Sequence, residues 1–383
     1  MIPIKYNVRS LTVRKATTLA TAFGIALVVF VLSASLMLAA GIKKTFATSA
    51  REDVAVVMRR GSDNEMSSAL EATNVSLISA GPGAKKDQVS GELVMVLAME
   101  KVGASGVTNV QIRGVTEAAA RLRPEVKILE GRLPLPGRDE VMVGTRIRGR
   151  FKDVDMGHRF ELRKNRPVTV VGVFSAEGSS TESEIWCDLD VFRAAFAREG
   201  YVSSVRVKLE SAASFDGFKA AMEGDKQYGF MATRETEYVK KQSEGTALFI
   251  GVIGTLISVF FAIGAMIGAM ITMYAAVANR QREIGTLRAL GFSRRSIMLS
   301  FLIESTTLAL FGGLVGGAAS MAMKLVKFSM MNFASWSEVV FSFEPTPEVI
   351  LTSLGFAVAM GLGGGFFPAL RAARVSPIQA MRG

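Results

Sequence analysis

Four long apolar runs constrain the fold of this 383-residue chain more than any other feature. A helix needs about 20 mostly apolar residues to cross roughly 30 Å of hydrocarbon. The mean hydropathy of +0.32 and the hydrophobic fraction of 49% are also too high for an ordinary soluble protein. We therefore expect four transmembrane helices, at 17–41, 246–278, 296–323 and 347–368.

The first apolar run has two interpretations. Lysines and arginines precede it and small residues follow it, as in a cleaved secretory signal. Its apolar core continues for about 24 residues, whereas the apolar region of a signal has roughly 7–15. We therefore expect a retained anchor, preceded at 1–16 by a cytoplasmic amphipathic segment that contacts membrane lipids.

The excess of positive over negative charge lies in three short segments, at 5–15, 280–295 and 371–382. Together they hold twelve lysines and arginines and one glutamate, which equals the whole net charge of +11. Four crossings would place all three on one side of a membrane, and basic loops mark the cytoplasmic side. We therefore expect both termini in the cytoplasm, and the charge indicates topology rather than nucleic-acid binding.

The region 42–232 has no apolar run long enough to cross a membrane, and its patterns alternate between strand and helix. This predicts a large α+β extracytoplasmic domain, of one or two lobes, inserted between transmembrane helices 1 and 2. Strands are expected at Asp53–Met58, Leu93–Leu97, Val107–Val115, Glu140–Val143, Pro167–Phe174 and Ser203–Leu209, and helices at Asp188–Arg198 and Ser214–Glu223.

The segments that flank the later spans complete the expected organisation. The polar stretch at 233–245 lacks glycine and proline until it meets the second span, which predicts a rigid stalk helix that continues into the membrane. Residues 324–346 are expected to form a short extracytoplasmic loop, and residues 369–383 a cytoplasmic tail.

Pairs of glycines four residues apart occur in the second and third spans. Gly264 and Gly268, and likewise Gly312 and Gly316, have the spacing that lets the backbones of two helices approach closely. We expect helix packing at both pairs. The alternative is that these glycines belong to flexible membrane helices without a special interface.

Residue patterns for catalysis and for metal binding are missing. The sequence contains no Gly-x-x-x-x-Gly-Lys-Ser/Thr loop for ATP, no Gly-x-Ser-x-Gly elbow and no His-Glu-x-x-His helix. His158 and Cys187 are the only residues of their types, so neither an intramolecular disulfide nor a His/Cys metal cluster can form. We expect no catalytic residue, no metal and no bound cofactor.

Glu304 lies about 12 Å into the third span at 1.5 Å per residue. An acid within a membrane is costly and therefore suggests a functional site. The alternative is structural, because Glu304 could reach the headgroup layer or accept hydrogen bonds from neighbouring hydroxyls. We favour the structural interpretation, because a proton relay would need further intramembrane acids.

The segment 279–295 differs from an ordinary cytoplasmic loop. Its apolar residues have the spacing of a short amphipathic helix, with Gly291 as a C-cap and Ser293 as the cap of the next helix. A solvated connection between two spans would not need these apolar residues. They indicate burial against a partner or against lipid headgroups.

Three motifs resemble the MacB/FtsX-type (type VII) ABC transporter permeases. The first is Arg282-Glu-Ile-Gly-Thr-Leu-Arg-Ala-Leu-Gly-Phe-Ser-Arg-Arg295, and the second is the tail Pro368–Arg382. The third, Gly131-Arg-Leu-Pro followed by Gly137–Gly144, is similar to the periplasmic domain of the family.

This resemblance implies a permease that transmits ATP-driven motion and has a second copy, or a related permease, as its partner. It implies that 279–295 is the coupling helix on a cytoplasmic ABC ATPase, which would bind the ATP and Mg. Because the family's N-terminal ATPase domain is absent from this sequence, we expect a separate ATPase chain. The docking residues would be Arg282, Glu283, Ile284, Leu287, Arg288, Leu290, Gly291 and Phe292, with the apolar side chains filling a groove of the ATPase.

Within the family we favour efflux with a periplasmic adaptor and an outer-membrane channel. Release of lipoproteins by a Lol-type permease is the alternative, and control of cell-wall hydrolases is the third. Two alternatives lie outside this family. A membrane-anchored sensor or scaffold would have no ATPase partner. A proton-coupled carrier would need more charged residues within the membrane than Glu304 alone. The substrate cannot be read from the sequence.

Overall fold

The computed structural model describes residues 15–103, 106–225 and 227–376, and its contacts divide the chain into two units. The helical unit comprises Met1–Ala40, Phe249–Val326 and Phe343–Gly383, and the sheet unit comprises Gly41–Leu248 and Lys327–Ser342. The predicted fold class is confirmed, since four candidate membrane helices accompany an α+β domain that follows the first of them. The predicted segment at 1–16 and the end of the tail lie largely outside the described residues.

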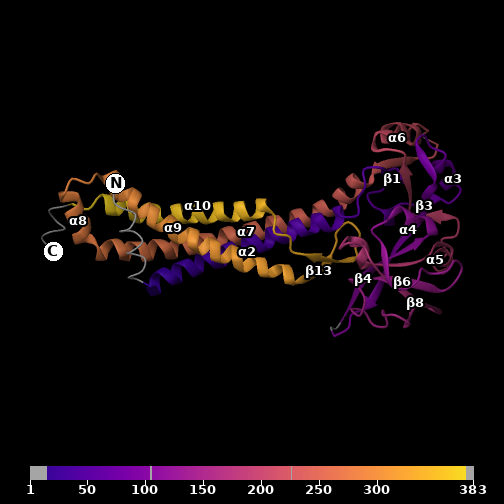
Figure 1. Ribbon diagram of the computed structural model, residues 1–383, viewed down its shortest axis with the longest axis horizontal. Coiled ribbons are helices and arrows are strands. Elements are labelled where there is room, and N and C mark those ends of the chain that lie inside the picture. Colours follow the sequence, from indigo (N-terminus) through magenta and orange to yellow (C-terminus); the bar gives the residue numbers. More distant parts are fainter. Residues whose placement is uncertain (1–14, 104–105, 226, 377–383) are drawn as a thin grey trace. The chain divides into compact units, whose positions relative to one another are not determined.

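Four helices in the described chain are long and apolar enough to span a membrane. They are α2 (Lys15–Ala47), α7 (Glu235–Asn279), α9 (Arg294–Met321) and α10 (Pro347–Ala373), and the short helix α8 (Gln281–Ala289) lies between α7 and α9. Within the helical unit the long helices run alongside one another (Figure 1). They share an apolar core to which each contributes side chains, including Val29, Ala262, Ala309 and Ala357.

Two glycines of α9 lie directly against the backbone of α2. A Cβ atom at Gly312 would lie 2.6 Å from the carbonyl oxygen of Ala22, and one at Gly316 would lie 2.2 Å from that of Ala26. Real Cβ atoms do not approach so closely, so only glycine allows this separation between the helices. A polar contact joins α2 to a third helix, since Ser33 on α2 donates a hydrogen bond of 2.8 Å to Ser353 on α10.

Helix α7 is continuous from Glu235 to Asn279, which agrees with the predicted stalk helix that continues into the second span. One helix boundary differs from the expected spans. Helix α10 continues past Pro368 to Ala373, whereas the span was expected to end at Pro368. A proline removes only one backbone donor and, although it kinks helices, it is tolerated in membrane helices where neighbours satisfy the freed carbonyl.

The sheet unit is built around a ten-stranded sheet in the order β12-β1-β11-β3-β4-β9-β6-β8-β5, with β7 paired to β8, as counted over the described residues. Its strands are β1 (Val54–Arg59), β3 (Ala84–Glu100), β4 (Val107–Val115), β5 (Lys127–Gly131), β6 (Glu140–Gly144), β7 (Arg159–Arg163), β8 (Arg166–Ser175), β9 (Glu184–Asp188), β11 (Ser204–Leu209) and β12 (Phe230–Arg234). A further short pair joins β2 (Leu70–Glu71) to β10 (Tyr201–Val202).

The long strand β3 connects two halves of this sheet. Its first part pairs with β11 up to Glu92, and its second part pairs with β4 from Leu93 onward. Helix α3 (Asn74–Ser79) packs on β3 and β11, and α6 (Phe215–Gly224) packs on β12. Helix α4 (Glu117–Leu122) packs on β3, and α5 (Leu189–Phe196) packs on β4 and β3.

Most predicted strands have a counterpart, because alternation of apolar and polar residues marks a strand with one buried face. Strand β4 coincides with the predicted Val107–Val115, and β8 extends the predicted strand by one residue at each end. The first half of β3 and the strands β5, β7, β9 and β12 were missed. The first half of β3 contains Lys85, Lys86 and Asp87, whose charges conceal the alternation.

The expected loop at 324–346 is an ordered hairpin instead. After the short 3-10 helix η4 (Ala322–Leu325), β13 (Lys327–Met331) pairs with β14 (Glu338–Ser342). The hairpin belongs to the sheet unit, although the helices on either side of it belong to the helical unit. The sequence did not predict it because a hairpin this short depends on tertiary contacts for stability.

The contact between Gly316 and α2 predicts that a methyl group added at Gly316 destabilises the protein, whereas one added at the neighbouring Gly317 does not. We expect Gly316→Ala to destabilise the purified protein by about 1–3 kcal/mol, because the nearest atoms belong to the backbone and cannot move aside. Gly317→Ala is the matched control, since nothing lies within 4 Å of its Cβ position. Thermal unfolding in detergent measures both, and equal melting temperatures would contradict the close contact.

Candidate functional site

The first candidate site is the segment between α7 and α9. Arg280 separates α7 from α8, and α8 ends at Leu290 with Gly291 at a φ of 94°. The amide of Phe292 donates to the carbonyl of Leu287 at 3.2 Å, and the amide of Gly291 donates to that of Arg288 at 3.2 Å. This pair of bonds is the Schellman motif, which ends helices at a glycine.

Ser293 then begins the next helix. Its side-chain oxygen accepts a hydrogen bond of 3.2 Å from the amide of Ser296, so it is the N-cap of α9. The predicted helix end at Gly291 and the predicted cap at Ser293 are therefore confirmed. Helix α8 thus comprises the nine residues Gln281–Ala289, between Arg280 and the C-cap Leu290.

Ile284 corrects one expectation about docking. It is only 2% exposed and packs within the helical unit against Met273 and Val277 of α7, Ile297 and Phe301 of α9 and Ala369 and Ala372 of α10. It therefore cannot fill the groove of a partner while this packing is intact. Leu287 and Phe292 pack partly against the same cluster.

The opposite side of α8 faces outward. Among the predicted docking residues, Arg282, Glu283, Leu290 and Gly291 are exposed, and Arg288 is half-buried. Leu290 stands out because 72% of its surface is accessible. The predicted docking set therefore divides into an inner apolar group that anchors α8 and an outer group that a partner could contact.

Glu304 has a partner that the sequence did not reveal. Nη1 of Arg280 lies 3.1 Å from Oε2 of Glu304, and the two residues are 7% and 6% exposed. Arg280 is 24 residues earlier in the chain, so no helical spacing pointed to this pair. The structural interpretation of Glu304 is favoured, and one partner of its carboxylate is an arginine.

Gly264 and Gly268 do not pack against another helix of the chain. Nothing among the described residues lies within 4 Å of either Cβ position, and both glycines are exposed. Large exposed apolar side chains surround them on α7, namely Phe260, Phe261, Ile263, Ile267 and Ile271. The expectation of helix packing is therefore not met within the chain at this pair, in contrast to Gly312 and Gly316.

The second candidate site is a buried ionic cluster in the sheet unit, and Glu92 is at its centre. Glu92 is fully buried on β3 at the point where this strand changes its partner from β11 to β4. Arg113 of β4 contacts it at 2.9 Å, Arg123 after α4 at 2.7 Å and Arg206 of β11 at 3.3 Å. Each side of the strand junction thus contributes at least one arginine to the same carboxylate.

Glu65 and Glu184 complete the environment of Arg113. Glu65, in the short 3-10 helix η1 (Glu65–Ser67), lies 3.0 Å from Arg113 and accepts a hydrogen bond of 2.6 Å from Ser204. Glu184 of β9 accepts two hydrogen bonds of 2.8 Å from the same guanidinium. Burial acts to raise the pKa of Glu65, but the charges of Arg113 and Arg206 outweigh it and lower that pKa to about 2.

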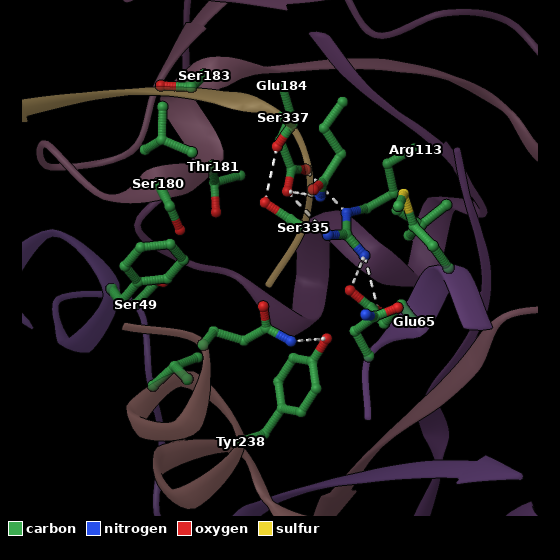
Figure 2. A pocket seen from close by; sticks show the side chains of 18 of the residues that line it. Ser49, Glu65, Arg113, Ser180, Thr181, Ser183, Glu184, Tyr238, Ser335 and Ser337 are labelled. Atoms are coloured by element: carbon green, nitrogen blue, oxygen red, sulfur yellow. Dashed lines mark hydrogen bonds and ion pairs between the residues drawn. The ribbon is translucent and has the colours of Figure 1, made fainter. Parts of the chain in front are cut away.

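The cluster also holds the first residue of α7. Glu235 forms a close ion pair with Arg206 and accepts a hydrogen bond of 3.2 Å from the amide of Arg51. Figure 2 shows the pocket beside the cluster, with Glu65, Arg113 and Glu184 on one side and Tyr238 of α7 on another. Hydroxyl groups also line the pocket, from Ser49, Ser180, Thr181, Ser183, Ser335 and Ser337, together with apolar side chains such as Phe46 and Val239.

The hairpin binds to both α7 and the sheet. Asn332 is fully buried, and its amide nitrogen donates a hydrogen bond of 3.0 Å to the carbonyl oxygen of Gln242 on α7. Glu338 lies 2.6 Å from Nζ of Lys101 and also pairs with Arg150. The connection between α9 and α10 is thus bonded to the same helix that begins in the ionic cluster.

The charged groups of the ionic cluster are paired with one another. All three arginines of the ionic cluster are engaged by carboxylates, and no group of three or more metal-ligating side chains occurs in the described residues. His158 is exposed in a turn, and Cys187 is buried. No sequence pattern indicated the cluster, because alternation alone places Arg113 and Arg206 on a polar face without showing that this face is covered.

Glu65 predicts how stability depends on pH. Its pKa in the folded protein is below its usual value of 4.5, so its contribution is fully present above pH 4.5 and is lost as the pH falls toward 2. We expect Glu65→Gln to cost about 3–5 kcal/mol at pH 7, since it leaves buried arginines undercompensated, and to flatten this acid dependence. Urea unfolding followed by tryptophan fluorescence from pH 7 to 3 tests both effects, and an unchanged slope would contradict the assignment.

Two family descriptions match the chain. Residues 16–224 match the MacB-like periplasmic core domain, and residues 247–377 match the FtsX-like permease C-terminal region. The first match includes most strands of the ionic cluster, and the second includes α8 and its neighbours.

Individual relatives agree with this assignment. The chain is 28% identical over 229 residues to the ABC transporter permease YknZ of Bacillus subtilis, covering 57% of this chain and 54% of YknZ. It is 29% identical over 228 residues to the macrolide export ATP-binding/permease protein MacB of Photorhabdus laumondii, covering 57% of this chain and 34% of MacB. The match thus spans about half the length of YknZ and a third of MacB.

Solved structures of similar proteins include the periplasmic region of MacB from Actinobacillus actinomycetemcomitans, with a TM-score of 0.36 at 13% identity, covering 50% of this chain and 92% of that one. The extracellular domain of YknZ has a TM-score of 0.34 at 16% identity. The match covers 47% of this chain and 99% of that domain. The match of the MacB-like core domain extends over more than half of the chain. The chain therefore belongs to the family of ABC transporter permeases that carry a MacB-like periplasmic core domain and an FtsX-like C-terminal region.

Proposed function

We propose that this permease couples ATP hydrolysis by a cytoplasmic ABC ATPase to conformational change in its periplasmic sheet unit. The observation that carries the proposal is the two-sided environment of α8. Ile284 anchors one side of this short helix in the core of the helical unit, while Leu290 is 72% exposed on the other. A helix exposed in this way between two membrane helices suits a partner that pushes on it.

The exposed surface of α8 has the composition of a docking site. Leu290 offers an apolar contact, and Arg282 and Glu283 offer charges of opposite sign that would orient the partner. ATP and Mg would be bound by the ATPase, because these 383 residues contain no P-loop.

Motion would reach the sheet unit through α7. This helix is continuous from the ionic cluster, where Glu235 pairs with Arg206, to Asn279 beside α8. The hairpin supplies a second connection, since Asn332 bonds to α7 and the flanking helices are α9 and α10. A shift of the helices would therefore act on the sheet unit through bonded elements rather than through a flexible linker.

Orientation follows from the basic segments. The three segments that carry the excess positive charge suit the cytoplasmic side, which would place both termini and α8 in the cytoplasm and the sheet unit in the periplasm. The inner membrane of a bacterium is the corresponding location. We further propose a second copy of the chain, or a related permease, against the exposed face of α7 that includes Gly264 and Gly268.

For the cargo, we favour export with a periplasmic adaptor and an outer-membrane channel. The support is the likeness to proteins named for macrolide export, which is a likeness of sequence and does not identify a substrate. Release of lipoproteins is the alternative within the family. Identification of the subunits that purify with the chain from native membranes would separate them, since an adaptor favours export and a second, different permease favours release.

The docking assignment predicts that a charge at Leu290 uncouples the ATPase. We expect Leu290→Asp to reduce stimulation of the co-purified ATPase at least tenfold, because a buried apolar contact would become an unpaired carboxylate. Leu129→Asp is the matched control, since Leu129 is an exposed leucine of β5 in the sheet unit. Stimulation that is unchanged in correctly inserted Leu290→Asp would refute docking at α8.

The dimer assignment predicts cross-linking at Gly264. With Cys187 replaced by serine, we expect Gly264→Cys to form a disulfide-linked dimer in native membranes under mild oxidation, because a second copy would bring the two positions together. Leu351→Cys is the control, an exposed position on α10. Equal cross-linking at the two positions would indicate random collision and would argue against this interface.

A further inference from the structure

We infer that the buried ion pair between Arg280 and Glu304 positions α8, so that force applied to α8 is delivered to α9. The inference concerns two residues outside the docking surface, and it rests on the proposed function. It assigns a role to the intramembrane carboxylate without requiring proton transfer. Arg280 and Glu304 would act as positioning residues, because neither is expected to contact the ATPase.

Arg280 occupies the junction between two helices. Its amide donates to the carbonyl of Val277 in the last turn of α7, at 3.2 Å, and its carbonyl accepts from the amide of Ile284 in α8, at 2.9 Å. Its backbone has a φ of −111° and a ψ of 14°, outside the regular helical values, so the chain changes direction at this residue. Such a junction is the natural place for α8 to swing relative to α7.

Glu304 restrains this junction from a different helix. It lies on α9, and its Oε2 atom is 3.1 Å from Nη1 of Arg280. Both residues are more than nine-tenths buried, so water cannot replace either partner at little cost. The pair therefore joins the hinge of α8 to α9 directly, across 24 residues of sequence.

The apolar cluster around Ile284 adds a second point of attachment. Ile284 packs on α7, α9 and α10, one turn after Arg280. An apolar contact resists separation but has no preferred direction, whereas an ion pair between two buried groups has a defined geometry. The ion pair accordingly sets the orientation of α8, and the apolar cluster keeps α8 against the helical unit.

The experiment compares the wild-type chain with Glu304→Gln, Arg280→Lys and the double exchange Arg280→Glu with Glu304→Arg. Each full-length chain is reconstituted in lipid nanodiscs together with the ATPase that co-purifies with the wild type. Backbone hydrogen exchange of residues 281–289 reports the restraint on α8 without requiring an ATPase. The amount of ATPase bound and its rate of ATP hydrolysis report docking and coupling separately.

We expect Glu304→Gln to raise hydrogen exchange in α8 at least tenfold and to lower ATPase stimulation at least fivefold, while the bound ATPase changes less than twofold. Arg280→Lys keeps the charge but changes its geometry, so we expect a smaller effect in the same direction. The double exchange should restore at least half of the stimulation. Glu348→Gln removes an exposed carboxylate from the first turn of α10 and is the control that should change none of these quantities.

Unchanged hydrogen exchange in Glu304→Gln would overturn the inference. Increased hydrogen exchange with full ATPase stimulation would also overturn it, as would a double variant, Arg280→Glu with Glu304→Arg, that restores no ATPase stimulation. If the wild-type chain itself gave no stimulation, the proposed coupling to an ATPase would fail. The exchange data would still decide whether the pair restrains α8. The two failures are therefore distinguishable.

Discussion

The sheet unit depends on the carboxylate of Glu92. It is buried where β3 changes partner, and arginines from β4, β11 and the end of α4 converge on it. A buried carboxylate is tolerated only when it is paired and hydrogen-bonded, so each of these elements must be in place for the others to be stable. Because Glu235 joins the same cluster through Arg206, the start of α7 shares this requirement.

The association of helices in the helical unit needs another source of stability, since lipid offers no hydrophobic force that brings helices together. Close backbone contact replaces it where Gly312 and Gly316 meet α2. The pair formed by Arg280 and Glu304 adds a directional contact near the opposite end of α9. Small residues and one buried ion pair thus hold the helices of this unit together, whereas an apolar core and the ionic cluster hold the elements of the sheet unit together.

The ionic cluster and the hairpin are both bonded to helix α7. Helix α7 is one uninterrupted element from Glu235 to Asn279, and the hairpin between α9 and α10 is bonded to it through Asn332. The ionic cluster and the hairpin contact are rigid for physical reasons, because breaking either leaves buried polar groups without partners. Rigid connections transmit displacement, and the hinge at Arg280 is where displacement would enter.

The sequence by itself determined the elements whose signals are local. The length of the apolar runs defined the four spans, and alternation of apolar and polar residues located strands such as Val107–Val115. Gly291 marked the end of α8, and Ser293 marked the start of α9. Only the tertiary structure decided which side chains meet. Ile284 was expected in the groove of a partner but is buried within its own chain, and Glu304 pairs with an arginine that precedes α8. The cluster around Glu92 brings together residues from six elements and the residue that follows α4. Periodicity shows that a residue has a polar or an apolar face, whereas the identity of the opposing surface depends on contacts between residues that are distant in the chain.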